Sequence, residues 1–255
     1  MAKNKYFDVY VTPGGGIEED IIKCFKSTKL GCFKLDGKEL RENGWNRIGN
    51  LVINNENYVY YEQFIVELLN ELIDGYTPEN PRIITSSEFI SLLGKKINNE
   101  NSILYWCYKN NINVYCPAIT DGSTGDIITF FNKRDCLKID IVQDIYNMNC
   151  ECMNLKRELL DIPNAEKKNG AIVVGSGIVK HHILNGNLFN DGLDYCVILN
   201  TAHEEDGSDA GASLQEAFSW GKVKPSKTCV KISGEASIIL PLLIYGGFKS
   251  NSNFE

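Results

Sequence analysis

The sequence predicts an α/β protein with a Rossmann-like, mostly parallel sheet and helices on both faces. Two observations lead to this fold class. Short runs rich in β-branched and aromatic residues alternate with segments of helical periodicity, which is the pattern of parallel β-α-β units. Glycine turns at residues 14–16 and 175–177 directly follow two of these runs and open helices.

The strands are expected where short apolar runs end in turns or polar loops. They span residues 7–12, 112–116, 171–174, 195–199 and 229–232. Helices are expected at residues 17–25, 61–73, 87–97, 102–110 and 139–159. A further helix after residue 177 carries His181 and His182, and a short helix lies within the segment 200–222. All strands are expected in one parallel sheet, and residues 1–255 in one domain.

Composition narrows the class of protein. An apolar content of 43% with 23% charged residues is typical of soluble globular proteins, and no run of 18 apolar residues suggests a membrane span. The first residues are too polar for a signal peptide, and several of the nine cysteines lie in apolar runs, so we expect a cytoplasmic protein with reduced thiols. Cys150 and Cys152 could be a ligand pair, but no second pair accompanies them and no metal site is expected. The net charge of −7 argues against nucleic acid and favours a cationic partner.

One segment near the C-terminal end, residues 200–222, concentrates the candidate chemistry. It contains five carboxylates, a tryptophan and a terminal lysine in a loop that follows a strand. The carboxylates are Glu204, Glu205, Asp206, Asp209 and Glu216. Because ligands of α/β sheets bind at this end of the strands, the segment predicts a site for a polycation.

Lys222 is the candidate nucleophile of this segment. Glu216 and Trp220 share one helical face, and Gly221 can end the helix in a left-handed conformation that turns Lys222 out of register. A lysine attacks only when its amine is neutral, which requires desolvation or cationic neighbours. The alternative is an ordinary surface lysine whose stem lies along the tryptophan.

The other candidates each have a structural alternative. The glycine turns could bind phosphates or simply permit tight turns. Glu18 and Glu19, after the first turn, could bind a ligand or complement their own helix dipole. The carboxylates of residues 121–126 could lie at the same rim or cap a helix. The adjacent histidines point to different faces, so one could reach a site while the other packs.

Six segments together resemble deoxyhypusine synthase. They are residues 15–24, 37–44, 46–51, 117–126, 177–182 and 200–222. The resemblance runs from about residue 5 to 246, in the family's order, and Glu-Ala-Phe-Ser-Trp-Gly-Lys (216–222) is its most specific part.

The resemblance implies an NAD-dependent transfer of the aminobutyl group of spermidine to one lysine of the translation initiation factor 5A precursor. It implies a homo-oligomer, a tetramer, with sites near subunit interfaces. Lys222 aligns with the lysine that forms the imine, and His181 with the acid/base group. The implied substrate-binding residues are Glu18, Glu19, Asp126, Asn185, Leu188, Gly207, Ser208, Asp209, Glu216 and Trp220. The implied cofactor-binding residues are Pro13, Gly14, Gly15, Asp121, Ser176, Thr201, Ala202, Glu235 and Ala236.

The chain departs from the family pattern at several of these positions. This chain has Pro13 where the family usually has threonine, Ser176 in place of glycine, His203 in place of glutamine, Ala210 in place of serine and Glu235 in place of aspartate. Family members normally carry a further N-terminal portion before the strand at 7–12. Two alternatives to a synthase therefore stay open, a truncated non-catalytic homologue acting as a partner subunit and a homospermidine synthase that uses putrescine as acceptor.

Overall fold

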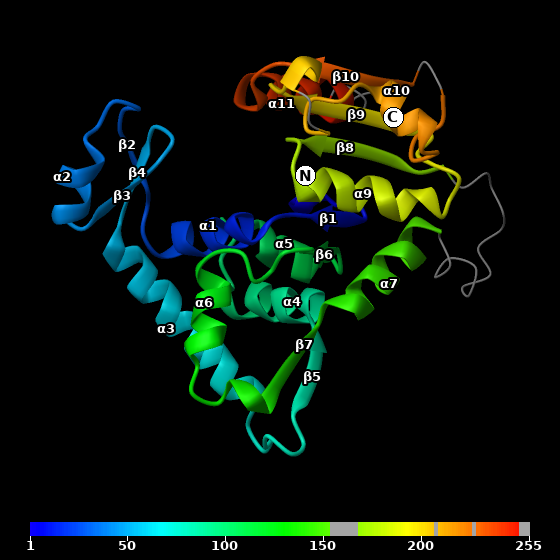
Figure 1. The fold of residues 1–255 in the computed structure, drawn as a ribbon. Helices are drawn as coiled ribbons and strands as arrows, with labels where there is room; N and C mark the ends of the chain where they lie inside the picture. The colour runs from blue at the N-terminus through cyan, green and yellow to red at the C-terminus, as the bar shows by residue number, and fades with distance from the viewer. Residues whose placement is uncertain (154–167, 207–208, 226–227, 250–255) are drawn as a thin grey trace. The chain divides into compact units, whose positions relative to one another are not determined.

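The computed structural model describes residues 1–153, 168–206, 209–225 and 228–249. Its contacts divide the chain into two compact units, Met1–Ile141 and Val142–Glu255, which we call the N-terminal and the C-terminal unit. Figure 1 shows the helices and strands of both units.

Two pairs of parallel strands organise the N-terminal unit. Strand β1 (Val9–Val11) pairs with β6 (Asn113–Tyr115), with Tyr10 opposite Val114. Strand β5 (Arg82–Thr85) pairs with β7 (Leu137–Asp140). The first pair confirms the strands expected at 7–12 and 112–116, each shorter than its apolar run. The second pair was not predicted, and β7 occupies the residues where the helix 139–159 was expected to begin.

The helices of the N-terminal unit cover these strands. They are η1 (Ala2–Asn4), α1 (Gly14–Phe25), α2 (Gly37–Glu42), α3 (Asn55–Leu72), α4 (Ser86–Ile97), α5 (Ile103–Lys109), α6 (Ser123–Phe130) and η2 (Arg134–Cys136). Helix α3 begins six residues before the expected 61, because its N-cap Asn54 accepts the Glu56 N–H at 2.8 Å and its first turn is polar. Helix α4 starts with a capping box in which Thr85 and Glu88 bond each other's backbone N–H.

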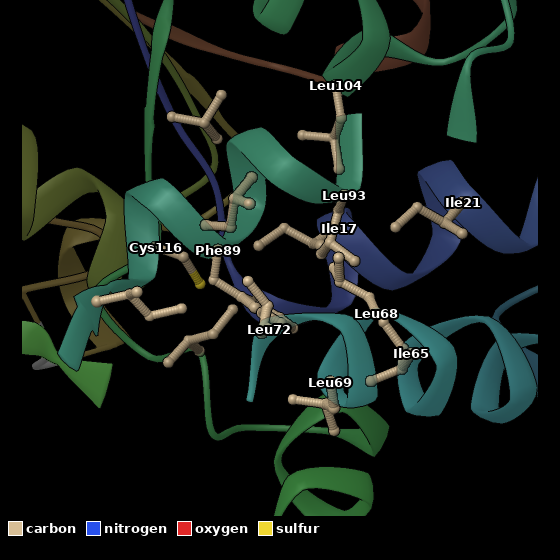
Figure 2. Packing of buried hydrophobic residues seen from close by; sticks show 14 of the residues in the cluster. Ile17, Ile21, Ile65, Leu68, Leu69, Leu72, Phe89, Leu93, Leu104 and Cys116 are labelled. Carbon is tan, nitrogen blue, oxygen red and sulfur yellow. The ribbon is translucent and has the colours of Figure 1, made fainter. Parts of the chain in front are cut away.

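The core of the N-terminal unit lies between α1, α3, α4 and α5. Figure 2 shows Ile17 of α1, Ile65 and Leu69 of α3, and Phe89 of α4 as members of one cluster, and all four are fully buried. Burying one such side chain stabilises the fold by about 1.5–3 kcal/mol. The helical spacing of these residues is therefore what fixes the positions of α1 and α3.

A small antiparallel sheet, absent from the prediction, also belongs to the N-terminal unit. Strand β4 (Leu51–Asn54) lies between β2 (Lys29–Leu30) and β3 (Trp45–Ile48). The two residues Gly49 and Asn50 join β3 to β4, with Gly49 at φ 60°. A glycine in the first position of a two-residue loop is a known hairpin signal, which the helix-and-strand periodicity did not capture.

The C-terminal unit contains a three-stranded parallel sheet. Its strands β8 (Gly170–Val174), β9 (Tyr195–Asn200) and β10 (Cys229–Ser233) lie side by side in the order β10-β9-β8 (Figure 1). The expected strands at 171–174, 195–199 and 229–232 are confirmed. The expectation of a single parallel sheet is wrong in one respect, because the five strands are divided between this sheet and the β1-β6 pair.

Helices and short turns connect these strands. They are α7 (Ile141–Cys152), α9 (Ile178–Leu188), η3 (Glu204–Asp206), α10 (Leu214–Ser219), α11 (Ala236–Ile244) and a final π-helical turn, η4 (Tyr245–Lys249). Helix α7 covers part of the expected helix 139–159, whose residues 154–159 lie outside the described part of the chain. Val173, Leu184 and Ile198 form the centre of a second core.

No helix in the described segments has both the length and the apolar character to cross a bilayer. The predicted α/β class with parallel sheets is thus confirmed.

Candidate functional site

A narrow cavity in the C-terminal unit lies between α9, β9 and α10. Its volume is about 20 Å³, which is room for about one water molecule. The lining residues are Lys180, His181, Leu184, Ile198, Ala212, Ser213, Glu216, Ala217, Trp220 and Lys222. Four residues of the predicted site, Lys222, His181, Glu216 and Trp220, are therefore brought together here.

The backbone of Lys222 is fixed by the way α10 ends. Gly221, at φ 69°, donates its N–H to the Phe218 carbonyl at 3.0 Å, and the Lys222 N–H bonds the Ala217 carbonyl at 3.0 Å. This pair of bonds is a Schellman motif, which requires a left-handed residue after the helix. The expectation that Gly221 ends the helix and turns Lys222 out of register is confirmed.

The other side of Lys222 is held just as firmly. Its carbonyl accepts the Leu193 N–H at 3.1 Å, and the Lys224 N–H bonds the Leu193 carbonyl at 2.9 Å. Val223 between them is buried. Lys222 is thus carried by a turn whose backbone is bonded on both sides, and only its side chain is free to move.

The side chain of Lys222 lies beside Trp220. The ammonium nitrogen is 5.5 Å from the centroid of the indole ring, a distance at which cation–π attraction at an exposed site contributes about 0.5–1 kcal/mol. Trp220 is 64% exposed, while Lys222 is half-buried. The indole therefore forms one wall of the cavity mouth with the amine at its edge.

Helix α9 contributes a second wall. His181, Asn185 and Leu188 recur at spacings of four and three and so share one face of this helix. Leu188 lies near the turn of Lys222, since a Cβ on Gly221 would be 3.7 Å from its Cδ1. His182 lies on a different face, where burial lowers its pKa and the Asp144 carboxylate acts in the opposite direction. The adjacent histidines are separated as expected, with His181 on the cavity.

Sequence reasoning missed Lys180. It is only 5% exposed and lines the cavity, and burial lowers its pKa against the opposing effect of Glu216 and Asp209. Its ammonium group donates to the backbone carbonyl of Asp209. Spacing could have found it, because Lys180 shares the buried face of α9 with Leu184 and Asn187.

The cofactor residues predicted in this unit follow the carboxyl ends of its strands. Ser176 follows β8, Thr201 and Ala202 follow β9, and Glu235 and Ala236 follow β10. Beside Ser176, a Cβ added to Gly175 or Gly177 would meet no atom within 4 Å. This turn, which opens α9, therefore leaves the backbone open to close approach by a ligand, as a dinucleotide phosphate requires.

Glu235 has a local structural task. Its carboxylate caps α11, accepting the Ser237 N–H at 2.9 Å and the Ser237 hydroxyl. Glutamate is an unusual N-cap, since the shorter Asp, Asn and Ser dominate this position. One carboxylate oxygen is thus already engaged in the fold.

The remaining predicted residues gather in the N-terminal unit, where α1 and α6 follow the parallel strands β1 and β6. Pro13 is the N-cap of α1, and Gly14 packs so closely that a Cβ on it would be 2.3 Å from the Asp121 carbonyl oxygen. Gly15 is open, with nothing within 4 Å of an added Cβ. Asp126 lies in the first turn of α6.

Glu18 and Glu19 have different surroundings. Glu18 is buried, and its Oε1 accepts the Thr124 N–H at 2.8 Å and the Thr124 hydroxyl at 3.2 Å. Tyr61 bonds the same hydroxyl at 2.6 Å. Burial raises the pKa of Glu18, while the bonds from Thr124 lower it. Glu19 is on the surface and pairs with Lys23 at 2.7 Å.

These contacts show that Glu18 and Glu19 do not complement the dipole of their own helix, which was one of the structural alternatives. Helix α1 begins at Gly14, so Glu18 and Glu19 lie beyond its first turn and do not complement its dipole there. Glu18 instead caps the neighbouring helix α6, whose own N-cap, Gly122, has no side chain to do so. The carboxylate thus occupies the position that a capping Asp or Ser normally fills.

The predicted residues Gly207 and Ser208 lie outside the described part of the chain. Within the described residues, no group of three or more His, Cys, Asp and Glu side chains could hold a metal ion. Cys150 and Cys152 are both buried, and burial raises the pKa of the Cys152 thiol to about 12.

Comparisons with known proteins agree on one family. The deoxyhypusine synthase family model matches residues 1–246. A deoxyhypusine synthase of Encephalitozoon cuniculi is 53% identical over 97% of the chain and 71% of its own length. Another, of Musa acuminata, is 47% identical over 97% of the chain and 64% of its own length. The chain thus spans about two thirds of these relatives.

The chain is also similar to a homospermidine synthase and to a solved crystal structure. Homospermidine synthase 2 of Senecio vernalis is 45% identical over 96% of the chain and 64% of its own length. A crystal structure from Entamoeba histolytica, described as a candidate deoxyhypusine synthase, matches with a TM-score of 0.58 at 26% identity. It covers 97% of this chain and 66% of that one.

Proposed function

Because the chain belongs to the deoxyhypusine synthase family, we propose that it transfers the aminobutyl group of spermidine to a lysine of the translation initiation factor 5A precursor. The observation that carries the proposal is the placement of Lys222. Its backbone is bonded on both sides, and its side chain lines a cavity shared with His181, Glu216 and Trp220.

The side chains of the cavity suit a polyamine. Spermidine is a chain of methylenes that carries ammonium groups, so carboxylates bind its charges and an aromatic ring contacts its methylenes. Glu216 and Asp209 are assigned the first task and Trp220 the second. Asn185 and Leu188, on the His181 face of α9, extend this wall. Glu18, Glu19 and Asp126 of the N-terminal unit are the further residues that the family resemblance assigns to polyamine binding.

NAD is the proposed cofactor. In the C-terminal unit, the open backbone at Gly175–Gly177 would hold it together with Ser176, Thr201, Ala202, Glu235 and Ala236 at the strand ends. Pro13, Gly14, Gly15 and Asp121 of the N-terminal unit are the further residues that the family resemblance assigns to this cofactor. When bound, NAD would accept a hydride from the carbon beside the secondary amine of spermidine and later return it.

Lys222 supplies the covalent step. The Nζ lone pair of Lys222 attacks the carbon of the substrate imine and forms a C–N bond. The π electrons of the C=N bond move to the imine nitrogen, and that nitrogen takes up the proton that Nζ releases. The bond from that carbon to the diaminopropane nitrogen then breaks, and the nitrogen leaves with the electron pair and takes a proton from His181. The Nζ lone pair forms the C=N bond of the enzyme imine, and the second Nζ proton passes to His181. Attack by the acceptor lysine on the enzyme imine reverses this exchange and frees Lys222.

The family resemblance extends the proposal to the whole protein. The match over residues 1–246 includes both units, which supports their action as one synthase domain. We further propose a cytoplasmic homotetramer, whose molar mass is measurable by light scattering.

A second candidate is favoured by one specific observation. Homospermidine synthases match this chain at 44–45% identity, about as well as the deoxyhypusine synthase of Senecio vernalis does at 45%. The two activities share the donor and the enzyme imine and differ in the acceptor, so Lys222 alone does not separate them.

The experiment that tests the proposal is borohydride trapping. The chain is incubated with spermidine and NAD, reduced and digested, and an aminobutyl adduct is sought on the Lys222 peptide by mass spectrometry. Lys222→Arg keeps the charge but removes the nucleophile, so the adduct is expected to disappear. Lys224→Arg, two residues away, is the matched control and is expected to retain it.

The acceptor is identified in the same assay. Chase of the adduct by the factor 5A precursor and not by putrescine supports the first candidate, and the reverse result supports the second. A folded wild-type chain that forms no adduct would contradict both and favour a non-catalytic partner subunit.

A further inference from the structure

Two lysines of the C-terminal unit point their ammonium groups at backbone carbonyls of one loop. The loop connects β9 to α10, and its described residues are 201–206 and 209–213. Lys180 of α9 donates to the Asp209 carbonyl, and Lys231 of β10 donates to the Gly211 carbonyl and, at 3.4 Å, to the Ala202 carbonyl. We call this segment the anchored loop.

The burial of Lys180 needs an explanation. Lys180 is 5% exposed as a residue, so its ammonium group gives up hydration, and an apolar side chain of similar size would pack there without that cost. Glu216 and Asp209 favour its charged form, while Lys222 and Lys231 disfavour it. In some proteins a buried charge contributes conformational specificity through its hydrogen bonds, and the bond that Lys180 makes is to the loop backbone at Asp209.

The anchored loop closes on itself. A Cβ on Gly211 would lie 1.8 Å from the His203 carbonyl oxygen, so the start and the end of the loop are in backbone contact. Lys231 bonds both sides of this contact, at Ala202 and Gly211. Lys180 fixes the position between them, Asp209.

The loop leads directly to Lys222. Residue 213 is the N-cap of α10, and α10 ends at the Schellman motif that carries Lys222. The backbone at Asp209 is thus fixed to α9, and α9 also carries His181 on the cavity. Lys180 therefore sets where the Asp209 carboxylate stands relative to the other groups.

Resting on the proposed function, we propose that Lys180 and Lys231 are positioning residues that hold the anchored loop so that Asp209 binds an ammonium group of the polyamine. Although Lys180 lines the cavity, its ammonium group is bonded to the Asp209 carbonyl, and neither lysine is assigned a substrate contact in this role. Each acts through the loop backbone, so its loss should weaken substrate binding more than the covalent step.

The test compares Lys180→Met with Lys224→Met in the full chain. Lys180→Met keeps the length of the stem and removes the donor. Lys224 is a matched lysine of the same unit that bonds the Asp194 side chain at 2.8 Å and no carbonyl among the described residues of the loop. Hydrogen exchange of peptides covering 201–206 and 209–213, the thermal midpoint, and kcat and KM for spermidine are measured for each.

We expect Lys180→Met to speed exchange about tenfold in the anchored loop and not in β8, β9 or β10. The KM for spermidine should rise about tenfold while kcat stays within about threefold, since one charge-assisted bond has been lost. Lys231→Met should speed exchange in the same peptides, and Lys224→Met should change neither quantity.

Two results would overturn the inference. One is unchanged loop exchange in Lys180→Met. The other is faster exchange throughout the C-terminal unit with kcat and KM altered together, which would make Lys180 a general stability residue. Hydrogen exchange needs no turnover, so a wild-type chain that forms no imine would refute the proposed function and leave the test of the loop intact.

Discussion

Glu18 in the N-terminal unit and Lys180 in the C-terminal unit are buried charges of opposite sign. Backbone groups satisfy both, an N–H group for the carboxylate and a carbonyl for the ammonium. In each case burial is the largest effect on the pKa and shifts it toward the neutral form, upward for Glu18 and downward for Lys180. The comparison shows that the backbone can offset the desolvation of either charge, through an N–H group for an anion and a carbonyl group for a cation.

The two buried side chains bond different kinds of structure. Glu18 bonds the first turn of a helix, where the dipole also favours an anion, and its partner Thr124 is fully buried. Lys180 bonds a loop. Loss of Glu18 should therefore lower the free energy of unfolding, whereas loss of Lys180 should act mainly on local motion.

Glu18→Ala should have the largest effect on stability. It leaves the Thr124 N–H buried without its acceptor, and we expect a loss of about 1–3 kcal/mol in the free energy of unfolding, measured with urea. Tyr61→Phe is the control, because Thr124 keeps its Glu18 partner, and about 0.5–1.5 kcal/mol is expected. Equal losses in the two variants would remove the special role assigned to Glu18.

Gly221→Ala should cost somewhat less, about 1–2 kcal/mol, because an L-residue must adopt the left-handed conformation at φ 69°. Gly37→Ala is the matched control within a helix at ordinary φ, where an added Cβ meets nothing within 4 Å. It should be stabilising by about 0.4–1 kcal/mol. Thermal unfolding of the two variants measures both effects, and a neutral Gly221→Ala would contradict the Schellman assignment.

The pH dependence of stability offers a finer test of Glu18. Its folded pKa lies above the ordinary 4.5, so the folded state retains a proton that the unfolded state has lost. Its contribution is fully present below pH 4.5 and is lost as the pH rises through the folded pKa. In Glu18→Gln, the free energy of unfolding measured with urea should no longer decline as the pH rises from 4.5 through the folded pKa of Glu18. A pH dependence of that free energy identical to the wild type would refute the raised pKa.

Glu19→Ala should have the smallest effect. Its ion pair with Lys23 is on the surface, so a change within about 0.5 kcal/mol is expected by the same urea measurement. A loss comparable to that of Glu18→Ala would erase the distinction between the buried and the exposed member of this pair of neighbours.

The sequence predicted the parts of the fold that depend on local patterns. The apolar runs of β1, β6, β8, β9 and β10 and the glycine that ends α10 were found because each is a short-range signal. Strands β5 (Arg-Ile-Ile-Thr) and β7 (Leu-Lys-Ile-Asp) were missed because each has only two aliphatic residues, and because the end of β7 overlaps the helix expected at 139–159.

The site was predictable only in part, for a related reason. Lys222, Glu216 and Trp220 are neighbours in one helix and its cap, so spacing alone relates them. The cap that Glu18 forms on α6 joins residues 106 positions apart, and the bond from Lys180 to Asp209 joins residues 29 apart. Such contacts arise from tertiary packing and have no local signature.

The narrowness of the cavity has a kinetic consequence. On the proposed function, a space for about one water molecule would admit a polyamine only after side chains such as Trp220 swing aside, so we expect an opening step to precede or accompany capture. Rates of association followed through the indole emission should therefore level off at high spermidine concentration. The plateau would report how often the entrance opens.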